Sequence, residues 1–340
     1  MAPPNTVEVL ELSRVAPPPG SVSEASLPLT FFDVFWIVLP PVQRLFFYEF
    51  SPTNTTTSHF FDSLLPHLKH SLSLALQLFY PLAGNLILSP QTGEHEVRYV
   101  EGDSISFTVA ESTADFHHLV GNQQKNAEEL HPLVCQLPPP SLLALQVTLF
   151  PKNGFCIGIA LHHVVADGRS LAHFMKSWAS IYRTGDVSSI TTVPSFDRSL
   201  VKDVKGLKKI LLTQIADIKM EETLEDVDVA NQVHPVRATF VVGRAQIERL
   251  RHRVLASLPE LPHCTPFVLT CAHVWVCLVK ARGDIGDKTV HFIFANCIGL
   301  GFAEAKGCDL AREDGLVAGS DSIGRAIHGL ADGPLTGAEG

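Results

Sequence analysis

The chain has 340 residues, which is more than one small core needs and predicts two domains. Hydrophobic residues make up 46% and charged residues 18%, and with a mean hydropathy of +0.18 this composition excludes a wholly disordered protein. Asp and Glu together number 35 against 26 for Lys and Arg, so the net charge of −9 argues against nucleic acid or an anionic membrane as a partner.

Targeting and cysteine patterns predict a cytoplasmic protein. Residues 1–15 lack a basic start followed by an apolar block, so we predict no secretory signal. The longest uncharged run, residues 71–93, contains two prolines and several serines and is too polar to span a bilayer. The seven cysteines include no C-x-x-C pair, which suits reduced thiols better than a zinc site or disulfides.

Strand and helix signals alternate without an internal repeat, which is typical of a mixed α/β fold. From Phe61 onward, leucines and phenylalanines recur at spacings of three and four, so we predict a core-facing helix that ends near Tyr80 and Gly84, with Pro66 in its first turn or marking its start. Residues 143–150 and 155–161 are β-like runs joined by Pro-Lys-Asn-Gly, and the Asn-Gly pair predicts a hairpin.

The second run of this hairpin has two different faces. Its odd positions are large and apolar, whereas Cys156, Gly158 and Ala160 form a small surface against which another segment can pack closely. His162 and His163 follow where the strand ends. Ser170 is expected to cap a helix, whose apolar face consists of Leu171, Phe174, Trp178 and Ile181.

The remaining elements follow a polar crossover over residues 184–233, in which we expect one helix. We then predict a strand over 238–242, a helix over 244–258 and a strand over 290–294. A further helix begins at Thr265-Pro266, and because residues 267–278 are apolar nearly all round, we expect it to be fully buried. Ten of the 42 residues from Gly299 onward are glycine, so the C-terminal tail is expected to be poorly specified.

The strongest functional candidate is H-x-x-x-D-G, formed by His163, Asp167 and Gly168. With 16 histidines and 17 aspartates, the H-x-x-x-D spacing arises about once by accident, and the second copy at His328 is interpreted as such a chance match. The first copy differs because a hairpin delivers it to a strand end and a capped helix follows, a place where catalytic side chains are commonly presented.

The residue types of this motif suit some chemistries better than others. A histidine there can remove a proton near neutral pH, and an aspartate four residues later can hold the turn, but a purely structural His163 stays open on the residues alone. A metal site would need His162, His163, Asp167 and His173 to converge, which is disfavoured because adjacent residues of a strand point to opposite faces. The sequence contains no G-x-S-x-G, no thiol-nucleophile signature and no phosphate-binding glycine loop.

Eight stretches spread over nearly the whole chain resemble the BAHD acyltransferases of plants, specifically the group that transfers malonyl or related acyl units from coenzyme A to glycosides of anthocyanins, flavonoids and other phenolics. They are LPLTFFD at residues 27–33 with Trp36, PVQRLFFY at 41–48, FYPLAGNL at 79–86, HHVVADGRS at 162–170, FMKSW at 174–178, Pro194 with Asp197 and Arg198, AHVWVC at 272–277 and AEAK at 303–306.

Two departures from the family sequence stand out. After Phe294 the family continues through a V-D-x-R-like strand, a proline-bearing loop and Y-F-G-N-C, whereas here Phe294-Ala295 is followed directly by Asn296-Cys297. The family's D-F-G-W-G signature does not occur in this sequence. We therefore expect an internally deleted and C-terminally truncated form, such as a splice product or an incomplete gene model.

The resemblance implies a two-domain α/β fold of the chloramphenicol acetyltransferase type with an incomplete second domain. The expected division is an N-terminal acyltransferase domain over 1–195, a crossover over 196–233 and a partial second domain over 234–340. In the family, two similar domains meet along a solvent channel that both substrates enter.

The resemblance also implies roles for the motif. His163 would be the general base that deprotonates the acceptor hydroxyl, and Asp167 would be structural, paired with an arginine from the block that is absent here. Gly168 and Arg169 are candidate substrate contacts, although a solvent-facing cation is the favoured interpretation of Arg169. The co-substrate would be acyl-CoA, with malonyl-CoA favoured, and the acceptor a phenolic or flavonoid glycoside.

No metal or permanently bound cofactor is implied, and a monomer is expected. The alternative is a non-catalytic remnant or a ligand-binding product of the same family.

Overall fold

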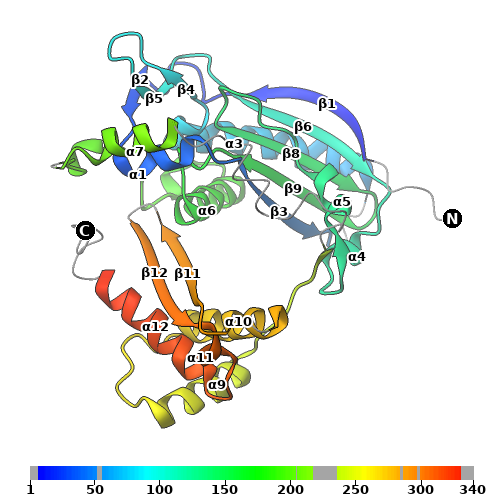
Figure 1. Ribbon diagram of the computed structural model, residues 1–340. Coiled ribbons are helices and arrows are strands. Elements are labelled where there is room, and N and C mark those ends of the chain that lie inside the picture. The colour runs from blue at the N-terminus through cyan, green and yellow to red at the C-terminus, as the bar shows by residue number, and fades with distance from the viewer. Residues whose placement is uncertain are drawn as a thin grey trace. The chain divides into compact units, whose positions relative to one another are not determined.

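The computed structural model describes residues 7–51, 56–203, 205–216, 236–283, 286–296 and 299–330. The chain divides into two compact units, Met1–Thr239 and Phe240–Gly340, and each is considered by itself (Figure 1). No helix within the described ranges is both long and apolar enough to cross a membrane. The expected assignment of residues 1–195, 196–233 and 234–340 to acyltransferase domains and a crossover stays a prediction.

The first unit is built on a five-stranded sheet. Its strands, in spatial order, are β1 (Val7–Val15), β6 (Ile105–Ser112), β8 (Leu143–Phe150), β9 (Gly154–Leu161) and β3 (Val42–Glu49). Only the β6–β8 pair is parallel, and the other neighbours run antiparallel. All residues of β8 and β9 are buried, which suits two strands with neighbours on both sides.

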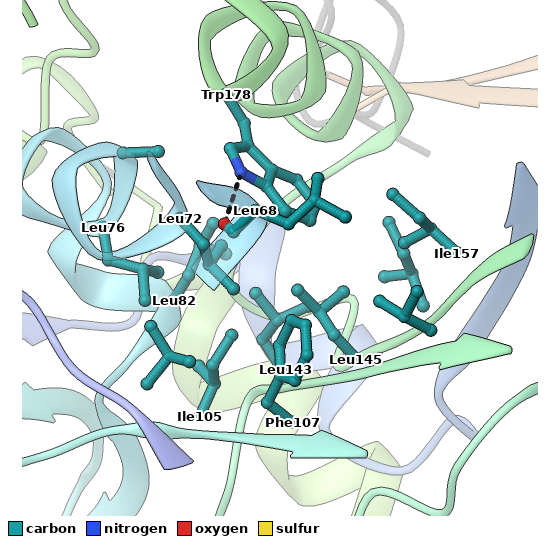
Figure 2. Packing of buried hydrophobic residues seen from close by; sticks show 14 of the residues in the cluster. Leu68, Leu72, Leu76, Leu82, Ile105, Phe107, Leu143, Leu145, Ile157 and Trp178 are labelled. Atoms are coloured by element: carbon teal, nitrogen blue, oxygen red, sulfur yellow. Dashed lines mark hydrogen bonds between the residues drawn. The ribbon is translucent and has the colours of Figure 1, made fainter. Parts of the chain in front are cut away.

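Two helices cover one face of this sheet. The α3 helix (Leu65–Leu78) continues the short α2 (Thr57–His59) and the π turn η2 (Phe60–Leu64), and α6 spans Gly168–Thr184. Figure 2 shows Leu68, Leu72 and Leu76 of α3 above apolar side chains of the strands. The indole of Trp178 in α6 donates to the carbonyl oxygen of Leu68 at 3.3 Å. The helix predicted from the leucine spacing is therefore confirmed, with Pro66 in the first turn of α3.

The small face of β9 accepts a close neighbour, as its composition predicted. The 3₁₀ turn η4 (His131–Leu133) crosses it, and a Cβ added to Gly158 would lie 2.0 Å from the carbonyl oxygen of Leu133. The short helices α4 (Phe116–Val120) and α5 (Ala127–Leu130) lie near this turn in the chain, and Phe116, Leu119, Leu133 and Cys156 pack into one cluster. Only glycine at this position lets the two backbones approach so closely.

The predicted hairpin is confirmed, but its turn differs from the prediction. Phe150 pairs with Gly154, so the loop has three residues, and the positive φ of 68° falls on Lys152 rather than on the Asn-Gly pair. Gly154 instead opens β9, where a Cβ would lie 2.2 Å from the carbonyl oxygen of Tyr48 in the neighbouring β3. The glycine is needed for strand packing, not for the turn.

A second layer lies at one end of the first unit. It contains a sheet of β2 (Ala25–Pro28), β5 (His95–Tyr99) and β4 (Asn85–Leu88), the helix α1 (Phe31–Val34) with the 3₁₀ turn η1 (Phe35–Ile37), and α7 (Leu207–Ala216). The α7 helix contacts α1 (Figure 1), and Leu211, Leu212 and Ile215 share an apolar cluster with Val34. The helix expected within the polar crossover is therefore present and belongs to this layer.

Short elements complete the first unit: the 3₁₀ turns η3 (Tyr80–Leu82), η5 (Val187–Ser189) and η6 (Arg198–Leu200), and a two-residue pairing of β7 (Lys125–Asn126) with β10 (Val236–Arg237). The strand predicted over residues 238–242 is wrong, because the backbone of these residues forms no ladder and Phe240 is 89% exposed. An apolar β-branched run forms a strand only where a partner backbone is available.

In its described residues, the second unit consists of four helices and a two-stranded sheet. The elements are α9 (Arg244–Ser257), α10 (Pro266–Arg282), α11 (Gly307–Ala311), α12 (Gly315–Leu330), β11 (Thr289–Asn296) and β12 (Gly299–Lys306). The predictions for residues 244–258, for the helix start at Thr265 and for the strand over 290–294 are confirmed.

Two predictions for this unit are wrong. The α10 helix is not fully buried, since Phe267, Val274 and Leu278 are 53%, 45% and 53% exposed, because its described neighbours cover only the opposite side. The segment after Gly299 is not poorly specified as far as Leu330, because β12, α11 and α12 occupy it. Its glycines let elements approach, and a Cβ at Gly319 would lie 3.4 Å from Ala272. Residues 331–340 lie outside the described ranges.

Candidate active site

The candidate site begins where the buried strand β9 ends. Leu161, its last residue, is paired with strands on both sides, and His162 and His163 follow directly. The backbone N–H of His162 donates to the carbonyl oxygen of Leu142 at 2.9 Å, which extends the pairing by one residue before the chain turns. The sequence prediction that His163 stands at a strand end is confirmed.

Asp167, and not Ser170, caps the helix that follows. The Oδ1 of Asp167 accepts a hydrogen bond from the backbone N–H of Ser170 at 2.7 Å, and α6 begins at Gly168. Ser170 therefore lies inside the first turn, as the third helical residue. Both residue types cap helices well, but only Asp167 has the extended backbone, with a ψ of −177°, that a cap requires. Asp167 is 7% exposed, so the aspartate has a structural function in this turn.

His162 is held by its own turn. Its Nδ1 accepts a hydrogen bond from the backbone N–H of Val164 at 3.3 Å, and its carbonyl oxygen accepts from Val165 at 3.2 Å. Burial, and secondarily the charge of His163, lowers the pKa of His162 below its usual value. A neutral imidazole with one nitrogen committed to the backbone is a structural histidine.

His163 has a different environment. Its imidazole stacks on the indole of Trp36, with ring centroids 3.8 Å apart and an angle of 9° between the planes. Its Nδ1 is buried and has no hydrogen-bond partner in the part of the chain that the structure describes. Sequence reasoning noted Trp36 only as part of a matching stretch. Nothing in the local pattern could have revealed the contact, because it joins segments far apart in the chain.

The segment that carries Trp36 is held in place by hydrogen bonds, an ion pair and apolar packing. It lies in η1, directly after α1, and Oδ2 of Asp33 in α1 accepts hydrogen bonds from the N–H and the hydroxyl of Thr30, both at 2.8 Å. The same oxygen forms an ion pair with Nη1 of Arg198 at 2.9 Å. Trp36 also packs against the apolar cluster that contains Val164, the residue after His163.

A cavity of about 380 Å³ opens beside His163. Its lining comes from β3, the end of β9, the turn and α6: Val42, Arg44, Phe46, Leu161, His163, Ala166, Asp167, Gly168, Leu171, Ala172, Met175 and Lys176. This volume falls within the range of small-molecule sites. The sequence-predicted residues His163, Asp167 and Gly168 line it, whereas Arg169 is exposed and lies outside the lining. Sequence reasoning missed the cations Arg44 and Lys176.

Other chemistries find little support among the described residues. No group of three or more His, Cys, Asp and Glu side chains within those ranges could hold a metal ion, and His173 lies 2.9 Å from the carbonyl oxygen of Thr192 through its Nε2. Burial raises the pKa of Cys156 to about 12 and that of Cys135 to about 11, so neither thiol is a ready nucleophile. The chance motif begins at His328 in α12, and its Asp332 lies outside the described residues.

A histidine at a strand end, in a cavity lined by apolar and cationic side chains, can remove a proton from a bound hydroxyl. The fold and the cavity define the class of protein: an α/β protein with a histidine at a strand end beside a cavity of small-molecule size.

Comparison with known proteins extends this assignment to a family. The profile of the Transferase family matches residues 5–298. A malonyl-coenzyme A:anthocyanin 3-O-glucoside-6''-O-malonyltransferase of Dahlia pinnata is 37% identical over 299 residues, which cover 82% of this chain and 63% of that protein. Phenolic glucoside malonyltransferase 2 of Arabidopsis thaliana is 36% identical over 360 residues, covering 96% of this chain and 78% of that protein.

The fold is shared with a solved structure. The crystal structure of vinorine synthase aligns with a TM-score of 0.62 at 19% identity, covering 95% of this chain and 75% of that one. The chain therefore belongs to the Transferase family, the BAHD acyl-CoA-dependent acyltransferases, and has their α/β fold, as its sequence motifs predicted. It spans 63% of the length of the Dahlia protein and 78% of the Arabidopsis protein.

Proposed function

We propose that this protein transfers an acyl group, preferentially malonyl, from acyl-CoA to a hydroxyl of a phenolic or flavonoid glycoside, with His163 as the general base. The observation that carries the proposal is the position of His163: it follows the buried strand β9 of a BAHD-family chain and lines a cavity of about 380 Å³. The functions of the related malonyltransferases support the donor and acceptor classes.

The proposed reaction is a direct transfer. The neutral imidazole of His163 takes the proton of the acceptor hydroxyl while the oxygen attacks the thioester carbonyl carbon. The tetrahedral oxyanion then collapses, the carbon–sulfur bond breaks, and the leaving thiolate of coenzyme A receives the proton from the imidazolium. A thioester is already activated, so the reaction needs neither an acyl-enzyme nor a bound cofactor. General-base catalysis of this kind contributes about 10²–10⁴ in rate.

The charges of the cavity fit an anionic donor. Arg44 and Lys176 both line it, and cations at these places favour a carboxylate or a phosphate near His163. Every acyl-CoA donor carries the phosphates of coenzyme A, and the malonyl group adds a carboxylate, which supports malonyl-CoA over donors with a neutral acyl group. Gly168 keeps its proposed contact with substrate because it lines the cavity, whereas the exposed position of Arg169 favours a solvent-facing cation.

We also propose that the protein acts in the cytoplasm and as a monomer. The scattered cysteines suit a reducing compartment, and the six in the described ranges are free thiols.

The test measures release of coenzyme A from malonyl-CoA in the presence of a phenolic glucoside. His163→Ala is expected to lower kcat/KM at least about 10²-fold, because the general base is lost. The matched control is His162→Asn, which keeps an acceptor for the N–H of Val164 and is expected to stay within about tenfold of the parent. Equal losses at the two positions would show that His163 is not the base.

The alternative function is ligand binding without catalysis. The family's V-D-x-R-like block is absent between Phe294-Ala295 and Asn296-Cys297, and its absence favours weak turnover. The two functions are separated by measuring malonyl-CoA binding by calorimetry beside turnover. Binding without turnover in this chain, and turnover on restoring that block, would favour the alternative.

A further inference from the structure

The imidazole of His163 lacks the support that usually orients a histidine base. Such a ring is commonly fixed by a hydrogen bond from its second nitrogen to a carboxylate or a carbonyl oxygen. Here Nδ1 is buried and has no hydrogen-bond partner among the described residues. If Nε2 is to accept the substrate proton, Nδ1 must carry the ring hydrogen. That N–H then has no hydrogen-bond acceptor among the described residues. The orientation of the ring must come from another contact.

The stack on Trp36 supplies that contact. At a centroid separation of 3.8 Å and an angle of 9°, the two rings are in full face contact, so rotation of the imidazole about its side-chain bond would break the stack. The neighbouring His162 shows the ordinary arrangement, because its Nδ1 is engaged by the N–H of Val164 at 3.3 Å. The two adjacent histidines are therefore oriented by different means.

We propose that Trp36 is the positioning residue of the base: its indole holds the imidazole of His163 by stacking, in place of a hydrogen bond to Nδ1. This inference rests on the proposed function, since the step it serves is proton removal by His163. Trp36 suits the task because its own segment is anchored by the Asp33–Arg198 ion pair at 2.9 Å and by apolar packing.

The stack also bears on the proton transfer itself. When His163 takes the proton, a cation lies over the face of an indole, which is the best aromatic partner for a cation. The charged groups that line the cavity with His163 are Arg44 and Lys176, which oppose that charge, and Asp167, which favours it. His162 adds no fixed charge while it is neutral. The interaction with Trp36 thus strengthens as the proton moves, and that difference aids the chemical step rather than substrate binding.

The first test needs no substrate. The ring protons of His163, assigned by their loss in His163→Ala, lie over the indole and are expected upfield of the other histidines in the NMR spectrum. Trp36→Leu should move them downfield, and Trp36→Phe, which keeps a flat ring of smaller ring current, should move them part of the way. The matched control is Phe35→Leu, which removes the other aromatic residue of the same turn and leaves the stack in place. Phe35 lies edge-on to Trp36 at 5.4 Å.

The second test separates positioning from substrate binding. Trp36→Leu is expected to lower kcat about 10- to 100-fold, since a small misplacement of a base has a cost of this order. The KM for either substrate should change by less than about threefold, and Trp36→Phe should recover most of kcat. Phe35→Leu should stay within about threefold of the parent in both constants.

Two results would overturn the inference. The first is a His163 signal that has the same chemical shift in Trp36→Phe and Trp36→Leu as in the parent, which would mean that no stack exists. The Phe variant alone decides this if the Leu variant fails to fold. The second is a raised KM with unchanged kcat, which would make Trp36 a wall of the substrate site. A parent chain without turnover would tell against the proposed function instead, while the NMR measurement still decides the stack.

Discussion

Adjacent histidines in this protein have different environments because their rings have different neighbours. His162 directs Nδ1 into its own turn and is held neutral, whereas His163 stacks on Trp36 and lines the cavity. The sequence shows two identical side chains side by side. The strand-end position predicted that one of them faces a cavity, but the assignment of each ring depended on contacts beyond the strand.

The lowered pKa of His162 has a consequence for stability. The unfolded chain binds a proton at this residue near the ordinary pKa of 6.5, whereas the folded chain binds it only at lower pH. Stability from this residue is therefore fully present above about pH 6.5 and is lost as the pH falls through the folded pKa. We expect acidification from about pH 7.5 to 5 to lower the free energy of unfolding more in the parent than in His162→Asn.

Urea titrations across that pH range, followed by circular dichroism, measure the effect. Asparagine is chosen because its side-chain oxygen can still accept from the N–H of Val164. If the two proteins show parallel dependence on pH, His162 does not titrate differently in the folded and unfolded states.

At the scale of elements, local pattern predicted most helices and the central hairpin. The spacing of leucines in α3 and of large residues in α6 identifies each buried face, because the α-helical period brings these positions together. The predictions failed where the structure of a segment depended on its contacts or its backbone conformation rather than on its own residue pattern. Ser170 and Asp167 both match a helix cap, and the backbone at Asp167 decided between them.

Substitution at Asp167 tests the cap directly. Asp167→Ala is expected to lower the free energy of unfolding by about 1 kcal/mol, since the N–H of Ser170 loses its acceptor. Asp167→Asn keeps a side-chain oxygen in the same place and should lose much less. Denaturant unfolding of both variants gives the comparison. An Asn variant as unstable as the Ala variant would indicate that the charge of Asp167, rather than its cap, stabilises the turn.

At the scale of the whole molecule, each unit has its own apolar cluster, but one helix of the second unit is only partly covered. Phe267, Val274 and Leu278 of α10 are spaced by seven and four residues, so they form one exposed stripe. The opposite face of α10, which includes Val268, Ala272 and Trp275, is buried against the rest of the unit. Exposed apolar surface of this kind favours association between copies of the chain.

Charged substitutions in the stripe should therefore reduce association at raised protein concentration. The double variant Phe267→Glu and Leu278→Lys leaves the net charge unchanged and places each charge at the favourable end of the helix. We expect a smaller weight-average mass by light scattering, with the unfolding free energy altered by about 0.5 kcal/mol or less per site. Lys280→Gln, at an exposed polar position of the same helix, is the control and should not change association.

The sequence by itself determined the fold class, the hairpin, the helix that follows it, the family and the motif at the end of β9. The elements, and each of the stretches that indicate the family, depend on residues close together in the chain, where periodicity and turn composition act directly. Only the tertiary structure decided that Trp36 stacks on His163, that Arg44 and Lys176 share its cavity, that Gly158 admits Leu133 and that α10 keeps an exposed stripe. The first three are contacts between segments that are distant in the chain, and the last is a helix face that no distant segment within the described ranges covers. Close packing, rather than local propensity, determines which distant segments meet.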